Sequence, residues 1–132
     1  MRAVDTNILV RFLVGDDEQQ AQQIYALFRQ AELANEQFMV PLLVVLELMW
    51  VLDAVYEVSR REIIDSLKDL LLMPILKFEA HPAVQECIAA AQAAGKPDLP
   101  DLLIAHSARR LGCEQILTFD KKAAKYKLFS LV

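Results

Sequence analysis

Short apolar runs alternate along this chain with longer stretches in which apolar residues recur every three or four positions. The first pattern is typical of buried strands and the second of amphipathic helices. In one long stretch, Ile24 and Phe28 fall on the same side of a helix, and Asp17 stands at its start, where the helix dipole favours an anion. The alternation predicts strands at 3–4, 38–40, 116–119 and 128–131, and helices at 7–14, 17–34, 41–56, 60–73, 82–94 and 99–111.

Residues with a known capping role mark several of these helix boundaries. Ser59 with Glu62 three residues later matches a capping box, and Pro41 suits the first turn of the helix that it opens. Gly95 and Gly112 stand where two later helices are expected to stop. These signals support the predicted helices independently of the apolar pattern.

The order of the elements predicts the fold class. Strands that alternate with helices favour a parallel sheet covered on both faces, because parallel neighbours need a crossover connection. The chain of 132 residues has the length of one domain and contains no repeat or linker. We expect an α/β protein with one domain over residues 1–132, a three-layer α/β/α fold around a central parallel sheet. Ligands bind such sheets at the carboxyl ends of the strands.

The apolar segments favour a cytoplasmic protein without a membrane partner. The most apolar stretch, residues 38–52, contains Pro41 and Glu47 and is shorter than the ~20 apolar residues that span a bilayer. Asp5 and Arg11 interrupt the N-terminal apolar segment, which a secretory signal would keep intact.

Four acids stand at the ends of predicted elements. Asp5 follows the first strand and Asp120 follows a later one, whereas Asp98 and Asp101 stand at the start of the last helix. Each could simply cap a helix, because a short acid accepts hydrogen bonds from free N–H groups. If several of them meet at the strand ends, they repel one another unless a divalent cation neutralises them. Ligands that are all oxygen favour magnesium or manganese.

Glu47 is an acid of a different kind, because it interrupts an apolar helix. Leu43, Val44, Trp50 and Val51 surround it at helical spacings, which predicts that it lies on a largely apolar face. A carboxylate on such a face is costly to bury unless something compensates its charge. Its position well inside the helix excludes a capping role, so the alternative to a functional site is an ion pair with an arginine.

These acids belong to four segments that resemble, in order and spacing, the motifs of the PIN domain family. The segments are AVDTNILVR at 3–11, LELMWVL at 46–52, DLPDLLIA at 98–105 and ILTFD at 116–120. They resemble most closely the VapC toxins, small prokaryotic PIN ribonucleases that are paired with VapB antitoxins. The resemblance spans the whole chain and implies a PIN-like fold.

The resemblance implies that Asp5, Glu47, Asp101 and Asp120 form a catalytic quartet that binds Mg²⁺, with Mn²⁺ as a substitute. Asp101 is chosen over its neighbour because it directly precedes the run Leu-Leu-Ile-Ala. The implied reaction is endonucleolytic hydrolysis of RNA phosphodiester bonds, in which the cation activates a water and stabilises charge. The auxiliary residues beside the quartet are Thr6, Asn7, Asp98 and Thr118. Between its two acids the third segment has Leu99 and Pro100, where the family often has Phe and Ala.

A basic segment directly follows Asp120. It contains Lys121, Lys122, Lys125 and Tyr126, a combination of cations and an aromatic ring that suits a phosphate backbone and a stacked base. The alternative is a solvated helix surface. Its position next to the predicted metal site favours a contact with RNA.

The resemblance also implies partners: an RNA substrate, a VapB-like antitoxin and a second copy in a homodimer. The helices over 17–34 and 41–73 offer more apolar surface than one small domain needs, with Trp50, Leu71, Leu72 and Met73 as candidate contacts. The acidic site predicts an inhibitory antitoxin tail that presents an arginine, because a guanidinium binds carboxylates in a bidentate way.

Two other functions remain open. Asp5 after a strand also resembles the start of an aspartate-nucleophile phosphatase, although that chemistry wants a second acid where Asn7 stands. An inactive PIN-like module for RNA binding or scaffolding is expected to have lost acids, and all four are present. The two histidines are assigned to structure, since His106 is five residues from Asp101 and faces another side of the helix.

Overall fold

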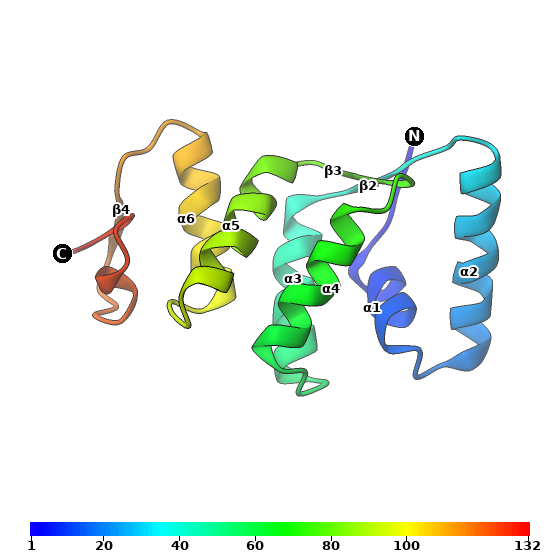
Figure 1. The fold of residues 1–132 in the computed structure, drawn as a ribbon, viewed down its shortest axis with the longest axis horizontal. Coiled ribbons are helices and arrows are strands. Elements are labelled where there is room, and N and C mark those ends of the chain that lie inside the picture. The colour runs from blue at the N-terminus through cyan, green and yellow to red at the C-terminus, as the bar shows by residue number, and fades with distance from the viewer. The chain divides into compact units, whose positions relative to one another are not determined.

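Strands and helices alternate along the chain in a computed structural model that describes all 132 residues (Figure 1). The structure contains six α-helices and five strands, and every strand pair is parallel. This confirms the expected α/β class with parallel strands, which form one sheet of three strands and one of two. The chain divides into two compact units, Met1–Glu79 and Ala80–Val132.

The first unit combines four helices with a three-stranded sheet of order β1-β2-β3. Arg2 pairs with Phe38, and Phe38 pairs with Leu76. In Figure 1 the strands lie at one end of this unit and the helices extend away from them. The elements are β1 (Arg2–Ala3), α1 (Thr6–Val14), α2 (Glu18–Leu33), β2 (Phe38–Val40), α3 (Leu42–Ala54), α4 (Arg60–Leu71) and β3 (Leu76–Phe78).

Apolar side chains between the helices and the sheet form the core of the first unit. α1 packs against α2 and α3, and α3 packs against α4. The rings of Phe12 and Phe28 lie 5.1 Å apart between centroids, and those of Phe28 and Phe38 5.8 Å, which joins α1, α2 and β2. The largest side chains with almost no exposed surface in this unit are Leu9, Leu48, Met49, Leu52, Leu67 and Leu70.

Side-chain caps fix the helix starts that the sequence predicts. The Asp17 carboxylate accepts a hydrogen bond from the Gln20 N–H at 3.0 Å, and the Ser59 hydroxyl accepts one from the Glu62 N–H at 3.2 Å. One cap was not predicted: Gly15 ends α1 in the left-handed region at φ +67°, where a side chain would be strained. Replacement of Ser59 with alanine removes one of these bonds and is expected to lower the free energy of unfolding by about 1 kcal/mol.

The second unit contains two packed helices and a parallel two-stranded sheet. Ile116 pairs with Phe129, and Thr118 pairs with Leu131. Its elements are α5 (His81–Ala93), α6 (Leu99–Arg110), β4 (Ile116–Thr118), the 3₁₀-helix η1 (Ala123–Lys125) and β5 (Phe129–Leu131). A buried cluster of Ala105, Ala123, Leu128 and Phe129 joins α6, η1 and β5, and Ile116 and Tyr126 pack against it.

None of the helices combines the length and the apolar composition that crossing a bilayer takes. The longest, α2, has polar and charged residues along most of one side.

Candidate functional site

Three of the acids singled out in the sequence lie near one another in the second unit. Asp98 occupies the N-cap position of α6 without a side-chain capping bond, Asp101 lies in the first turn, and Asp120 follows β4. Asp98 and Asp120 are exposed and Asp101 is half-buried. Burial raises the pKa of Asp101, and the negative charges of Asp98 and Asp120 raise it further. Asp98 and Asp120 therefore both repel the carboxylate of Asp101.

Burial of the charged carboxyl, together with this repulsion, predicts that Asp101→Asn stabilises the metal-free protein. A carboxyl whose pKa is higher in the folded than in the unfolded state destabilises the fold when it is charged, and this cost disappears as the pH falls through the folded pKa. Since repulsion between partly exposed charges is worth less than about 1 kcal/mol, we expect the melting temperature at pH 7 to rise by roughly 1–4 °C. Thermal unfolding in EDTA measures it.

The control for this measurement is Glu114→Gln, which removes an exposed carboxylate elsewhere in the same unit and is expected to leave the melting temperature unchanged. The stabilisation by Asp101→Asn should shrink as the pH falls through the raised folded pKa and disappear well below the ordinary value of 3.8, where the wild-type carboxyl is protonated in both states. A lower melting temperature for Asp101→Asn at pH 7 would contradict the clustering of the three acids.

Local hydrogen bonds fix the position of Asp120. Its Oδ1 accepts hydrogen bonds from the N–H groups of Lys122 at 2.8 Å and Ala123 at 3.3 Å, so it stabilises the turn that leads into η1. The Asp120 N–H in turn donates to Thr118 Oγ1 at 3.0 Å. Thr118 therefore holds the backbone of Asp120, two residues further along the chain.

Asp5 lies in the first unit and caps α1. Its Oδ1 accepts a hydrogen bond from the Ile8 N–H at 3.2 Å, which confirms the capping role weighed for it. The cap uses one carboxylate oxygen and leaves the other for a ligand. Thr6 is 4% exposed and lies within the core, whereas Asn7 is exposed and lines, with Asp5, a pocket of about 400 Å³ between α1 and α2.

The expectation that Glu47 lies on a buried apolar face is wrong. Glu47 is exposed on α3, and its apolar neighbours Leu43 and Trp50 are 78% and 61% exposed. α3 is apolar on nearly every side, so periodicity does not reveal which side is buried. Glu47 therefore has no burial cost for an arginine to offset. The face that is buried contains Val45, Leu48, Met49 and Leu52.

The structure divides the predicted quartet between the two units. Asp101 and Asp120 lie in the second unit, and Asp5 and Glu47 lie in the first, on two helices that pack against each other. The structure contains no group of three His, Cys, Asp or Glu side chains arranged to hold a metal ion. The donors themselves are all carboxylates, which suits a hard cation such as Mg²⁺, and the mutual repulsion at Asp101 is of the kind that a cation relieves.

The basic segment after Asp120 has two kinds of surroundings. Lys121, Lys122 and Lys125 are exposed. Tyr126 is half-buried, and its hydroxyl lies 2.8 Å from Nε2 of His106. The tyrosine is therefore held in place by α6.

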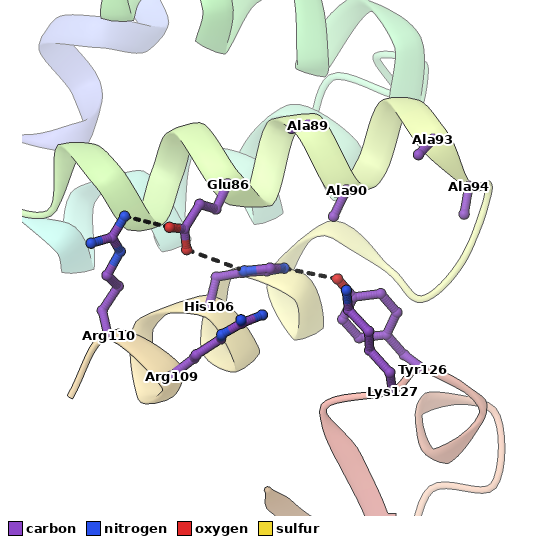
Figure 2. A pocket seen from close by; sticks show the side chains of 10 residues that line it. All are labelled: Glu86, Ala89, Ala90, Ala93, Ala94, His106, Arg109, Arg110, Tyr126 and Lys127. Atoms are coloured by element: carbon purple, nitrogen blue, oxygen red, sulfur yellow. Dashed lines mark hydrogen bonds and ion pairs between the residues drawn. The ribbon is translucent and has the colours of Figure 1, made fainter. Parts of the chain in front are cut away.

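Sequence reasoning missed a polar chain that joins α5, α6 and the segment after η1. Arg110 forms an ion pair with Glu86, whose other oxygen lies 3.4 Å from Nδ1 of His106, and His106 contacts Tyr126 (Figure 2). His106 is buried, in agreement with its assignment to structure. Its partners are 20 residues away on either side, so helix periodicity does not connect them.

Comparison with known proteins identifies relatives of the chain. The family model described as "PIN domain" matches residues 2–128. A protein named "VapC ribonuclease" from Aquifex aeolicus (strain VF5) is 26% identical over 125 residues, which cover 95% of this chain and 91% of the relative. No solved structure matches the chain.

Proposed function

The chain belongs to the PIN domain family, and from this premise we propose that it is a metal-dependent endoribonuclease, the toxin of a VapBC-type toxin-antitoxin pair. The observation that carries the proposal is the family match over residues 2–128, a span that holds all four acids of the motifs. The relative named as a VapC ribonuclease supports the reaction and the biological class. Because the match runs through both units, we further propose that they form one PIN domain that acts in the cytoplasm.

We assign the catalytic and metal-binding roles to Asp5, Glu47, Asp101 and Asp120. A divalent cation bound by these carboxylates supplies an activated water and neutralises charge on the phosphate. Mg²⁺ is the cation that oxygen ligands favour, and Mn²⁺ is its substitute. Thr6, Asn7, Asp98 and Thr118 are the auxiliary residues, and the hydrogen bond of Thr118 to the Asp120 backbone supports this role for it.

Each acid has a distinct task in the proposed hydrolysis. Asp5 and Asp101 are the principal ligands; burial and the charges of Asp98 and Asp120 raise the pKa of Asp101, and a bound cation would offset both effects. Glu47, exposed and free of capping bonds, orients the attacking water. Asp120 completes the site, with one oxygen already engaged in its turn. No side-chain nucleophile is required. Lys121, Lys122, Lys125 and Tyr126 contact the RNA.

We propose two protein partners. The first is a VapB-like antitoxin whose tail places an arginine at the carboxylates, where a guanidinium competes with the cation.

The second proposed partner is another copy of the chain. Apolar side chains left exposed on the first unit support pairing: Leu72 is 79% exposed and Trp50 61%, with Leu71 and Met73 half-buried beside Leu72. We expect light scattering to give twice the chain mass of 14.9 kDa. A monomer at high concentration would contradict pairing.

The reaction class is tested by offering the purified protein three substrates in Mg²⁺. We expect internal cleavage of single-stranded RNA and no release of phosphate from a small aryl phosphate. DNA of the same sequence serves as the third substrate. Phosphate release with a phosphorylated Asp5 would identify an aspartate-nucleophile phosphatase, and RNA binding without cleavage would identify an inactive module.

A further inference from the structure

The second unit contains a pocket of about 970 Å³ that the proposed catalytic residues do not line. It opens between α5, α6 and the segment that follows η1 (Figure 2). Its wall on α5 is formed by small apolar side chains, and its other residues are charged or aromatic. The lining residues are Glu86, Ala89, Ala90, Ala93, Ala94, His106, Arg109, Arg110, Tyr126 and Lys127.

Four of these residues form one polar chain. Glu86 forms an ion pair with Arg110, which is the main cause that lowers the pKa of Glu86, and its other oxygen lies 3.4 Å from Nδ1 of His106. Burial lowers the pKa of His106, against the effect of Glu86, and so favours the neutral imidazole. Nε2 of His106 lies 2.8 Å from the Tyr126 hydroxyl, whereas Nδ1 faces Glu86 without a hydrogen bond. These contacts hold the Tyr126 ring in place at the pocket.

The remaining two charged residues are cations whose side chains have no ion-pair or hydrogen-bond partner. Arg109 and Lys127 are both exposed, and both add positive charge near His106, whose pKa they lower. In Figure 2, Arg109 extends alongside the His106 ring and no interaction joins it to another residue. Three cations thus face the single carboxylate of Glu86, and the pocket has an excess of positive charge suited to an anion.

We infer that this pocket binds a backbone phosphate of the RNA substrate, with the adjoining nucleotide against the alanine wall and the Tyr126 ring. Arg109 and Lys127 supply the charge-assisted contacts to the phosphate. The ring and the methyl groups offer an apolar surface that accepts any base, so the contact adds affinity without reading sequence. The inference rests on the proposed function and extends it to a site that binds RNA away from the cleaved bond.

The helix geometry separates this pocket from the acids of the second unit. Asp101 lies in the first turn of α6 and Arg109 in the last, eight residues later. At 1.5 Å per residue the two positions are about 12 Å apart along the helix axis. The phosphate in the pocket is therefore not the one that is hydrolysed, and the two sites can be tested separately.

The test compares how tightly the wild type and the double variant Arg109→Ala/Lys127→Ala bind a labelled single-stranded RNA. The measurement is made in EDTA, which stops cleavage. We expect at least roughly tenfold weaker binding, because two charge-assisted contacts are lost. The slope of log affinity against log salt should become shallower by about 0.7 for each lost phosphate contact. The matched control is Arg61→Ala/Lys68→Ala, which removes two exposed cations of α4 and should bind as wild type. Arg109→Lys/Lys127→Arg should restore most of the affinity.

The possible outcomes distinguish a failure of the pocket assignment from a failure of the proposed function. If the wild type cleaves RNA but the double variant binds it with unchanged affinity and salt slope, the pocket assignment is wrong and the nuclease assignment stands. If the variant loses binding of AMP but not of RNA, the pocket holds a free nucleotide and the assignment to RNA is again wrong. If the wild type neither binds nor cleaves RNA, both fail. Circular dichroism confirms that each variant is folded.

Discussion

Asp101→Asn is expected to lower the rate of RNA cleavage by roughly 10²-fold or more at saturating Mg²⁺. The substitution keeps the size of the side chain but removes a charge that the proposed site uses to bind the cation. A bound cation contributes several kcal/mol of charge stabilisation in the transition state, and each 1.36 kcal/mol is a factor of ten in rate. Asp5→Asn should have a similar effect without unfolding α1, because asparagine also caps a helix. Single-turnover cleavage measures both rates.

The matched control for this prediction is Asp98→Asn. Asp98 lies three residues before Asp101, is exposed, makes no capping bond and has only an auxiliary role, so its replacement should lower the rate less than Asp101→Asn does. If Asp98→Asn were the more damaging substitution, the choice of Asp101 as the catalytic acid would be wrong. Unchanged rates for both Asp5→Asn and Asp101→Asn would exclude the proposed site.

Expression of the wild-type chain in a bacterial host is expected to arrest growth, and Asp101→Asn is expected to relieve the arrest. The reason is that uncontrolled RNA cleavage halts protein synthesis, whereas the variant folds but does not cleave. Co-expression of the product of the adjacent gene should also restore growth, because this product is expected to form a complex that purifies with the chain. Colony counts with and without induction measure both effects.

The growth experiment can also test the predicted contact between the antitoxin tail and the carboxylates. Replacing the arginine of the antitoxin tail with alanine should weaken the rescue, because the bidentate contact with the carboxylates is lost. The same replacement with lysine should restore it only in part. A wild-type chain that is harmless at high expression, and that no neighbouring product binds, would exclude the toxin assignment and leave the nuclease assignment in place.

Much of the fold could be predicted because periodicity and capping residues act locally. β2 has its predicted bounds, and α2, α3 and α6 lie within one or two residues of theirs. β3 was missed, because Leu-Lys-Phe is too short to show an alternation that stands out from its surroundings. The left-handed Gly15 was missed because it lies between two helices whose apolar patterns already mark the break.

Only part of the candidate site could be predicted from the sequence. The charges around Asp101 could be anticipated, since Asp98 and Asp120 flank elements that end near one another. The exposure of Glu47 could not, because an almost wholly apolar helix has no single face that its sequence marks as buried. The chain of Glu86, His106 and Tyr126 depends on how α5, α6 and the C-terminal segment pack, and no local pattern encodes that packing.

The central claim, that the chain hydrolyses RNA with a divalent cation held by carboxylates, is tested most directly by removing and restoring the metal. One labelled RNA is incubated with the protein after exhaustive treatment with EDTA, and then with Mg²⁺ or Mn²⁺ added in excess of the chelator. The account predicts that cleavage stops in EDTA, returns with either cation in the wild type, and does not return to the wild-type rate in Asp101→Asn. Undiminished cleavage in EDTA, or full activity of Asp101→Asn, would contradict it.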